Sequence, residues 1–135
     1  VIPGAVELSL DVRHADETVR AGHNRRILEC ADEIAARRGV ETSIHLQADN
    51  VSVPCAPRLV SLMAKAIEAE GMEAVQLASG AGHDAVPMSA LTDVAMLFVR
   101  CKGGISHNPA ESVTAEDMSV SIDVLSRFLE LLAKA

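Results

Sequence analysis

Apolar and polar residues alternate in two stretches near the start of the chain, the pattern of a strand with one buried face. The first stretch covers residues 6–12 and the second covers residues 40–48. Between them, apolar residues recur at helical spacing over residues 16–38, with acidic residues at the start and Gly39 at the end, as helix ends prefer. Residues 5–48 are thus predicted to form a strand, a helix and a second strand.

The pattern changes at residues 49–56, where an Asp-Asn pair and two nearby prolines interrupt it, and we expect a domain boundary there. Beyond it, an apolar helix face begins at Leu59 and stops at Gly71, and short apolar runs at residues 74–77 and 94–99 predict strands. The second run does not alternate, as expected for a strand covered on both faces in a parallel sheet. Thr114 followed by Asp117 then opens a helix that continues to residue 132. The expected fold class is α/β.

Composition narrows the class of protein. The chain has 135 residues, 49% of them apolar, which suits one globular domain or two small ones. No apolar run approaches the roughly 18 residues of a membrane span. Aromatic residues make up 1% and the net charge is −7, a combination that argues against nucleic-acid and anionic membrane partners.

The three cysteines are an odd number without close spacing, so we expect no disulfide framework and a reducing, cytoplasmic location. The chain begins with Val1, without a Met or a signal-like segment, and we expect it to be a piece of a longer protein.

Two polar loops directly follow predicted strands, the position where open α/β sheets bind ligands. In the first, residues 79–84, glycines let backbone N–H groups approach a ligand, and His83 can act as a donor or a metal ligand. An equally good interpretation is a tight turn in which His83 and Asp84 cap a helix. A phosphate cradle ranks lower, because the loop lacks the full glycine-rich phosphate motifs.

The second loop, residues 102–111, contains His107, which can supply a neutral imidazole to a metal, although a lone loop histidine is more often simply solvated. A catalytic metal needs about three protein ligands, and no second ligand set is apparent in the sequence. Arg13, at the end of the first predicted strand, can hold a carboxylate through two parallel hydrogen bonds. Its more common role would be an ion pair with Asp11, Glu7 or a partner.

Four stretches in one order resemble the amidase family of allantoate amidohydrolases, N-carbamoyl-L-amino-acid hydrolases and beta-ureidopropionases, also called the hydantoinase/carbamoylase family. They are VIPG at residues 1–4, LDVRH at 10–14, SGAGHDA at 79–85 and SHNPAE at 106–111. The resemblance covers essentially the whole chain. The Asn that precedes VIPG in the family is missing, because the chain starts at Val1.

The resemblance implies a fold. Family members are metal-dependent dimers, related to binuclear zinc carboxypeptidases and aminopeptidases, with a smaller α+β (ferredoxin-like) dimerisation domain inserted into an α/β catalytic domain. This chain resembles their C-terminal third. Residues 1–49 would be the last strand, helix and strand of the dimerisation domain, and residues 50–135 the C-terminal part of the catalytic domain.

The resemblance also implies a site. His107 is similar to the last metal ligand of a binuclear zinc or manganese centre, Gly82 and His83 to a substrate-contacting turn, and Arg13 to a clamp that holds the substrate carboxylate across the homodimer. The implied reaction is hydrolysis of a linear C–N bond by a metal-activated water, on an N-carbamoyl amino acid, a ureido acid or allantoate. The general base and the other metal ligands lie upstream in the family, so no catalytic residue is expected within this chain, and the isolated piece should be inactive.

Two other functions remain open from the residues alone. One is a non-enzymatic module that pairs or dimerises through a sheet edge or a helix face. The other is a small anion-binding α/β domain that uses the turn from Gly80 to Asp84 at a helix start.

Overall fold

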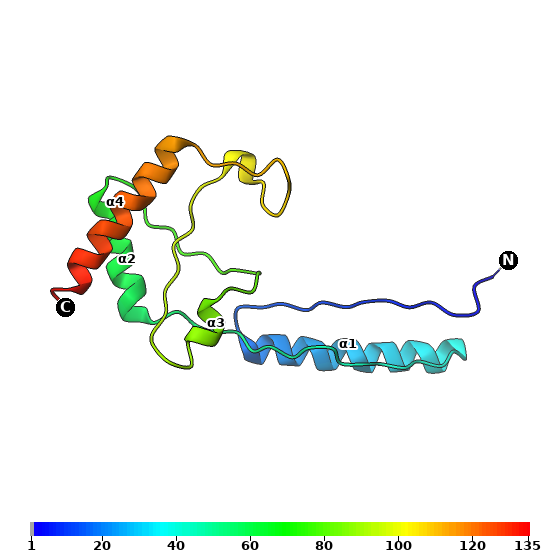
Figure 1. Cartoon of the computed structure of the whole chain (residues 1–135). Helices are drawn as coiled ribbons and strands as arrows, with labels where there is room; N and C mark the ends of the chain where they lie inside the picture. The colour runs from blue at the N-terminus through cyan, green and yellow to red at the C-terminus, as the bar shows by residue number, and fades with distance from the viewer. Residues whose placement is uncertain (1) are drawn as a thin grey trace. The chain divides into compact units, whose positions relative to one another are not determined.

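Three long helices dominate the structure, a computed structural model that describes residues 2–135. They are α1 (Glu17–Arg38), α2 (Pro57–Ala69) and α4 (Ala115–Leu132), and a four-residue helix α3 (Ala85–Met88) and a 3-10 turn η1 (Lys102–Gly104) lie between α2 and α4 (Figure 1). The three helices predicted from apolar spacing are confirmed.

Local capping explains where the helices begin and end. The Asp16 carboxylate accepts hydrogen bonds from the backbone N–H groups of Thr18 (2.8 Å) and Val19 (3.1 Å), and α1 ends at Gly39 in the left-handed conformation, with φ of 64°. In α4, the Thr114 hydroxyl accepts from the N–H of Asp117 at 3.0 Å. These bonds satisfy backbone groups that a helix end otherwise leaves unpaired.

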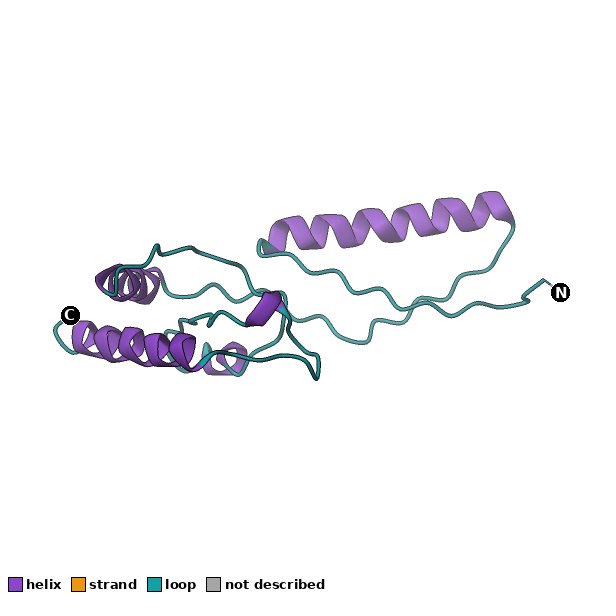
Figure 2. Cartoon of the chain, turned by 90° about the horizontal axis from the view of Figure 1, so that it is seen from above, coloured by secondary structure: helices purple, strands orange, loops and turns teal. Residues whose placement is uncertain are grey.

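The predicted strands are not observed, and the α/β class is therefore not confirmed. No β-strand occurs within residues 2–135, and Figure 2 shows only helices and loops. Residues 6–12, 40–48, 74–77 and 94–99 are loop segments, and no backbone hydrogen bond described for the chain joins any two of them. An alternating pattern indicates which side chains can share a buried face, but a strand forms only when its backbone groups find a neighbouring strand.

The chain divides into two compact units. The first takes in the chain up to Ser52 together with Ala78–Ala81, and the second takes in Val53–Leu77 and Gly82–Ala135. In the first unit, the two segments that flank α1 run lengthwise along one side of that helix (Figure 2). Their apolar side chains stay exposed, by 86% at Leu8 and 80% at Leu46. The assignment of residues 1–49 and 50–135 to two parent domains stays a prediction.

Helices α2 and α4 pack against each other and form the core of the second unit. Met63 and Ala66 of α2 meet Val124 of α4, and all three are buried. Leu97 packs against this core from the segment predicted as a doubly covered strand, and Phe98 and Val99 beside it are 47% and 44% exposed. That segment is thus only partly covered, because no second layer packs on it within the described residues.

No helix in the described part of the chain combines the length and the apolar character that crossing a bilayer requires. The three cysteines are all free and half-buried.

Candidate functional site

Arg13 is held by two groups of its own unit. Its Nε lies 2.9 and 3.0 Å from the two carboxylate oxygens of Asp11, and its Nη2 also donates to that carboxylate. Its Nη1 donates to the backbone carbonyl of Gly80, 67 positions along the chain. The fold therefore joins the LDVRH stretch to the SGAGHDA loop, two of the stretches that carry the family resemblance.

The pair formed by Arg13 and Asp11 is exposed, by 60% and 63% of the side chains. The hydrogen bond from Arg13 holds the pKa of the Asp11 carboxyl below its ordinary value, against a smaller effect of burial, and the attraction between the charges adds to the lowering. The same bond raises the pKa of Arg13. The ion pair with Asp11 that the sequence left open as an alternative is thus present, and it occupies only part of the guanidinium.

The turn predicted to contact the substrate, residues 79–84, begins with a hydrogen bond between a backbone N–H and a serine hydroxyl. The backbone N–H of Ala81 donates to the Ser79 hydroxyl oxygen at 3.1 Å, and the carbonyl of His83 accepts from Val86 at 2.9 Å where α3 begins. The Asp84 side chain makes no capping hydrogen bond to α3, which removes that part of the capping interpretation. Gly82 and His83 belong to the second unit, whereas Gly80 belongs to the first.

His107 has an unusual backbone conformation, and it lies in a loop whose residues hydrogen-bond to one another through the side chains of Ser106 and Glu111. Its φ is 58°, and it is the one residue other than glycine with positive φ among residues 2–135. Its backbone N–H donates to the Glu111 carboxylate at 2.8 Å, and its Nδ1 lies 2.7 Å from the Ser106 hydroxyl. With Nδ1 engaged in this way, Nε2 is the ring nitrogen that His107 can offer to a metal.

The described residues do not assemble a metal centre by themselves. Among residues 2–135, no group of three His, Cys, Asp or Glu side chains is close enough to hold a metal ion. A zinc or manganese site needs about three protein ligands or more, so the donors of this chain alone do not fit the binuclear centre that the resemblance implies.

A buried arginine that the sequence analysis did not single out lies in the first unit. Arg20 of α1 is 9% exposed and donates to the carboxylates of Glu17, at 2.9 and 2.7 Å, and Asp49, at 2.7 Å. Hydrogen bonds to both acids raise the pKa of Arg20, and the bond from Arg20 lowers the pKa of Glu17. The spacing of Glu17 and Arg20 on one helix face was the available signal. The contact with Asp49 depends on the fold.

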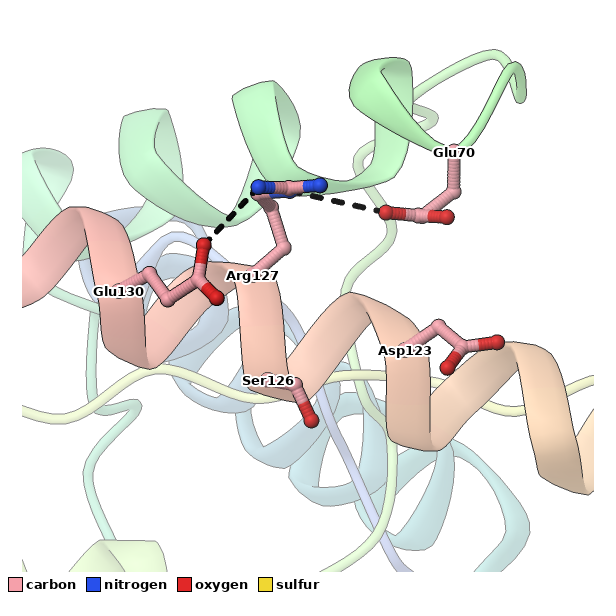
Figure 3. Close-up of a pocket in the computed structure, with 5 residues that line it drawn as sticks. All are labelled: Glu70, Asp123, Ser126, Arg127 and Glu130. Atoms are coloured by element: carbon pink, nitrogen blue, oxygen red, sulfur yellow. Dashed lines mark hydrogen bonds and ion pairs between the residues drawn. The ribbon is translucent and has the colours of Figure 1, made fainter.

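Two surface hollows lie in the second unit, and neither is lined by a predicted site residue. One, of about 240 Å³, lies between α2 and α4, where Arg127 is 3.7 Å from the Glu70 carboxylate and 2.9 Å from that of Glu130 (Figure 3). The other, of about 450 Å³, is lined by residues around Cys55 and Asp93.

Comparison with known proteins gives consistent matches. The model of peptidase family M20/M25/M40 matches residues 5–131. A probable allantoate deiminase of Oryza sativa subsp. japonica is 36% identical over 96% of this chain and 29% of its own length. An N-carbamoyl-L-amino-acid amidohydrolase of Pseudomonas sp. (strain NS671) is 33% identical over 93% of this chain and 30% of its own length.

An allantoate amidohydrolase of Bacillus subtilis (strain 168) is 30% identical over 98% of the chain and 32% of its own length. This chain therefore spans less than a third of the length of each of these three relatives. No solved structure matches the chain.

Proposed function

Because this chain belongs to peptidase family M20/M25/M40, we propose that it is part of a metal-dependent amidohydrolase that hydrolyses a linear C–N bond of an N-carbamoyl amino acid, a ureido acid or allantoate. The observation that carries the proposal is the set of relatives named for allantoate and N-carbamoyl-L-amino-acid hydrolysis. They are 30% to 39% identical over at least 93% of this chain. The non-enzymatic and anion-binding alternatives have no comparable support.

The proposal concerns a longer protein. Residues 1–49 are proposed to end its dimerisation domain, of α+β fold, and residues 50–135 to complete its catalytic domain, of α/β fold. The general base and the remaining metal ligands are expected upstream. The 135 residues alone are therefore expected to be inactive.

Each predicted site residue keeps a proposed role. Arg13 binds the substrate carboxylate, which suits a planar donor group that remains 60% exposed. Gly82 and His83 contact the substrate from the turn before α3. His107 is one metal ligand, a role that suits its closed loop and its available Nε2.

Family members are generally metal-dependent. We propose two divalent ions per subunit, zinc or manganese, held by His107 together with ligands outside this chain. Such ions, when bound, lower the pKa of a water molecule and polarise a carbonyl. Arg13 would bind the substrate by its carboxylate.

Activity and metal content of the full-length protein test this proposal together. We expect ammonia release from allantoate or from an N-carbamoyl amino acid, loss of activity with a chelator and recovery with Zn²⁺ or Mn²⁺. His107→Ala should lower both the bound metal and the rate, and His23→Ala, which changes an exposed histidine of α1, should alter neither. The proposal would be refuted if the wild type, supplied with Zn²⁺ or Mn²⁺, hydrolysed none of these substrates.

A homodimer in which Arg13 acts across the interface is a further part of the proposal. Arg13→Ala and His107→Ala subunits should each be poorly active alone. Mixed dimers should regain activity, because one of their two sites would receive an intact Arg13 from one subunit and an intact His107 from the other. Mixed dimers that stay as inactive as the parents would place both residues in a site formed by one subunit.

A further inference from the structure

The guanidinium of Arg13 is only partly used by its two partners. A guanidinium carries one N–H on Nε and two on each terminal nitrogen. The Asp11 carboxylate takes the Nε hydrogen and one hydrogen of Nη2, and the Gly80 carbonyl takes one hydrogen of Nη1. One N–H therefore remains on each terminal nitrogen. Both lie in the guanidinium plane, so both can donate to the oxygens of a further carboxylate.

Asp11 is well placed to set the direction of these donors. It lies two residues before Arg13 in an extended segment, and side chains two residues apart in such a segment point to the same face. The Asp11 carboxylate accepts from Nε and Nη2, along one side of the Arg13 guanidinium. This contact fixes the plane of the guanidinium and leaves one N–H on each terminal nitrogen. An exposed arginine without such a partner samples many rotamers, and ordering it costs free energy when a ligand binds.

The ion pair contributes little to holding the fold together. Both side chains are more than half exposed, and exposed ion pairs contribute little to stability, because water and salt screen the charges and ordering the side chains costs entropy. A purely structural role for Asp11 is therefore a weak explanation for the contact. Orientation of the free donors of Arg13 explains the geometry directly.

We propose that Asp11 is a positioning residue for Arg13, and that with the Gly80 carbonyl it presents the two remaining guanidinium N–H groups to the carboxylate of an N-carbamoyl or ureido acid. This inference rests on the proposed function of the full-length enzyme. It makes Asp11 a determinant of specificity for acids over neutral amides. This role explains why the negatively charged Asp11 lies beside Arg13, although its charge alone would weaken the binding of an anion there.

Steady-state kinetics on the full-length enzyme test the proposal with two substrates. One is the acid that the wild type hydrolyses, whether an N-carbamoyl amino acid, a ureido acid or allantoate, and the other is the carboxamide of that acid, which has no carboxylate. Asp11→Ala should raise KM for the acid about tenfold, the size of a weakened charged hydrogen bond, and should leave kcat and the carboxamide kinetics nearly unchanged. Asp11→Glu should restore part of the loss, and Glu7→Ala, an exposed acid on the same alternation, should have no effect.

The opposite results are informative. A lower KM for the acid in Asp11→Ala would show that Asp11 competes with the substrate for Arg13, and an equal rise in KM for acid and carboxamide would show a structural effect. Either result would overturn the proposal. If the wild type hydrolyses none of these acids, the proposed function fails. If Arg13→Ala raises KM for the acid and Asp11→Ala does not, only the positioning role fails.

A spectroscopic measurement is independent of turnover. In the wild type, the Nε–H of Arg13 should give a slowly exchanging NMR signal, because two carboxylate oxygens accept from it. Asp11→Ala should broaden or remove that signal, while Glu7→Ala should leave it in place. An unchanged signal in Asp11→Ala would show that the contact with Asp11 does not order the side chain of Arg13.

Discussion

Truncation of the Val124 side chain tests the packing of α2 on α4, which forms the core of the second unit. Val124 is 2% exposed and contacts the buried residues Met63 and Ala66 of α2. Val124→Ala deletes two methyl groups. At about 0.8 kcal/mol for each buried carbon, the transfer cost is about 1.6 kcal/mol, and the incompletely filled cavity adds a few tenths more. We expect a loss of about 2 kcal/mol in the stability of the helix pair.

Hydrogen–deuterium exchange of the full-length protein is the suitable assay, because it reports local opening in a protein of several units. A loss of about 2 kcal/mol corresponds to roughly 30-fold faster exchange in peptides from both α2 (Pro57–Ala69) and α4 (Ala115–Leu132). Ser119→Ala is the matched control, since it creates the same residue on an exposed position of α4. Equal exchange in Val124→Ala and Ser119→Ala, or acceleration in α4 alone, would refute the packing argument.

Three further predictions concern α1. Arg20→Leu should accelerate exchange in the first turns of α1, since it removes the donor that the carboxylates of Glu17 and Asp49 share. Arg25→Leu, at an exposed position on the same helix, should have little effect. The hydrogen bond from Arg20 lowers the pKa of Glu17, so its contribution is present above the ordinary glutamate pKa of about 4.3 and is lost as the pH falls through the lowered value. Glu17→Gln should flatten this acid dependence of exchange, and an unchanged profile would contradict it. Gly39→Ala should lower the free energy of unfolding by about 1 kcal/mol, because φ at this position is 64°. Gly22→Ala lies in the helix interior with open space around the added carbon, and it should raise the free energy of unfolding by about 0.5 to 1 kcal/mol, as thermal unfolding would show. Effects of the same sign at both glycines would be evidence against the left-handed end of α1.

The helices could be predicted from sequence because their determinants are local. Asp16 caps a backbone N–H three residues away, and Thr114 does the same for Asp117. Apolar spacing of three and four residues then defines which face of each helix packs. All of these interactions lie within a few positions of one another, so no knowledge of the rest of the fold was needed.

The strands could not be settled in the same way. Alternation at residues 6–12 and 40–48 predicted strands, but these segments lie beside α1 as loops, because the pairing of a strand depends on a partner from elsewhere in the fold. Leu8 and Leu46 therefore remain exposed in the described structure.

The same division applies to the candidate site. By itself, the sequence determined its residue types: Arg13 with Asp11 two positions earlier, a glycine-rich turn with His83, and a polar loop with His107. Only the tertiary structure decided that the Gly80 carbonyl meets Arg13 across 67 positions, and that Asp49 completes the environment of Arg20. Short-range spacing dictates which groups can share a face, whereas contacts between distant segments depend on how the whole chain folds back on itself.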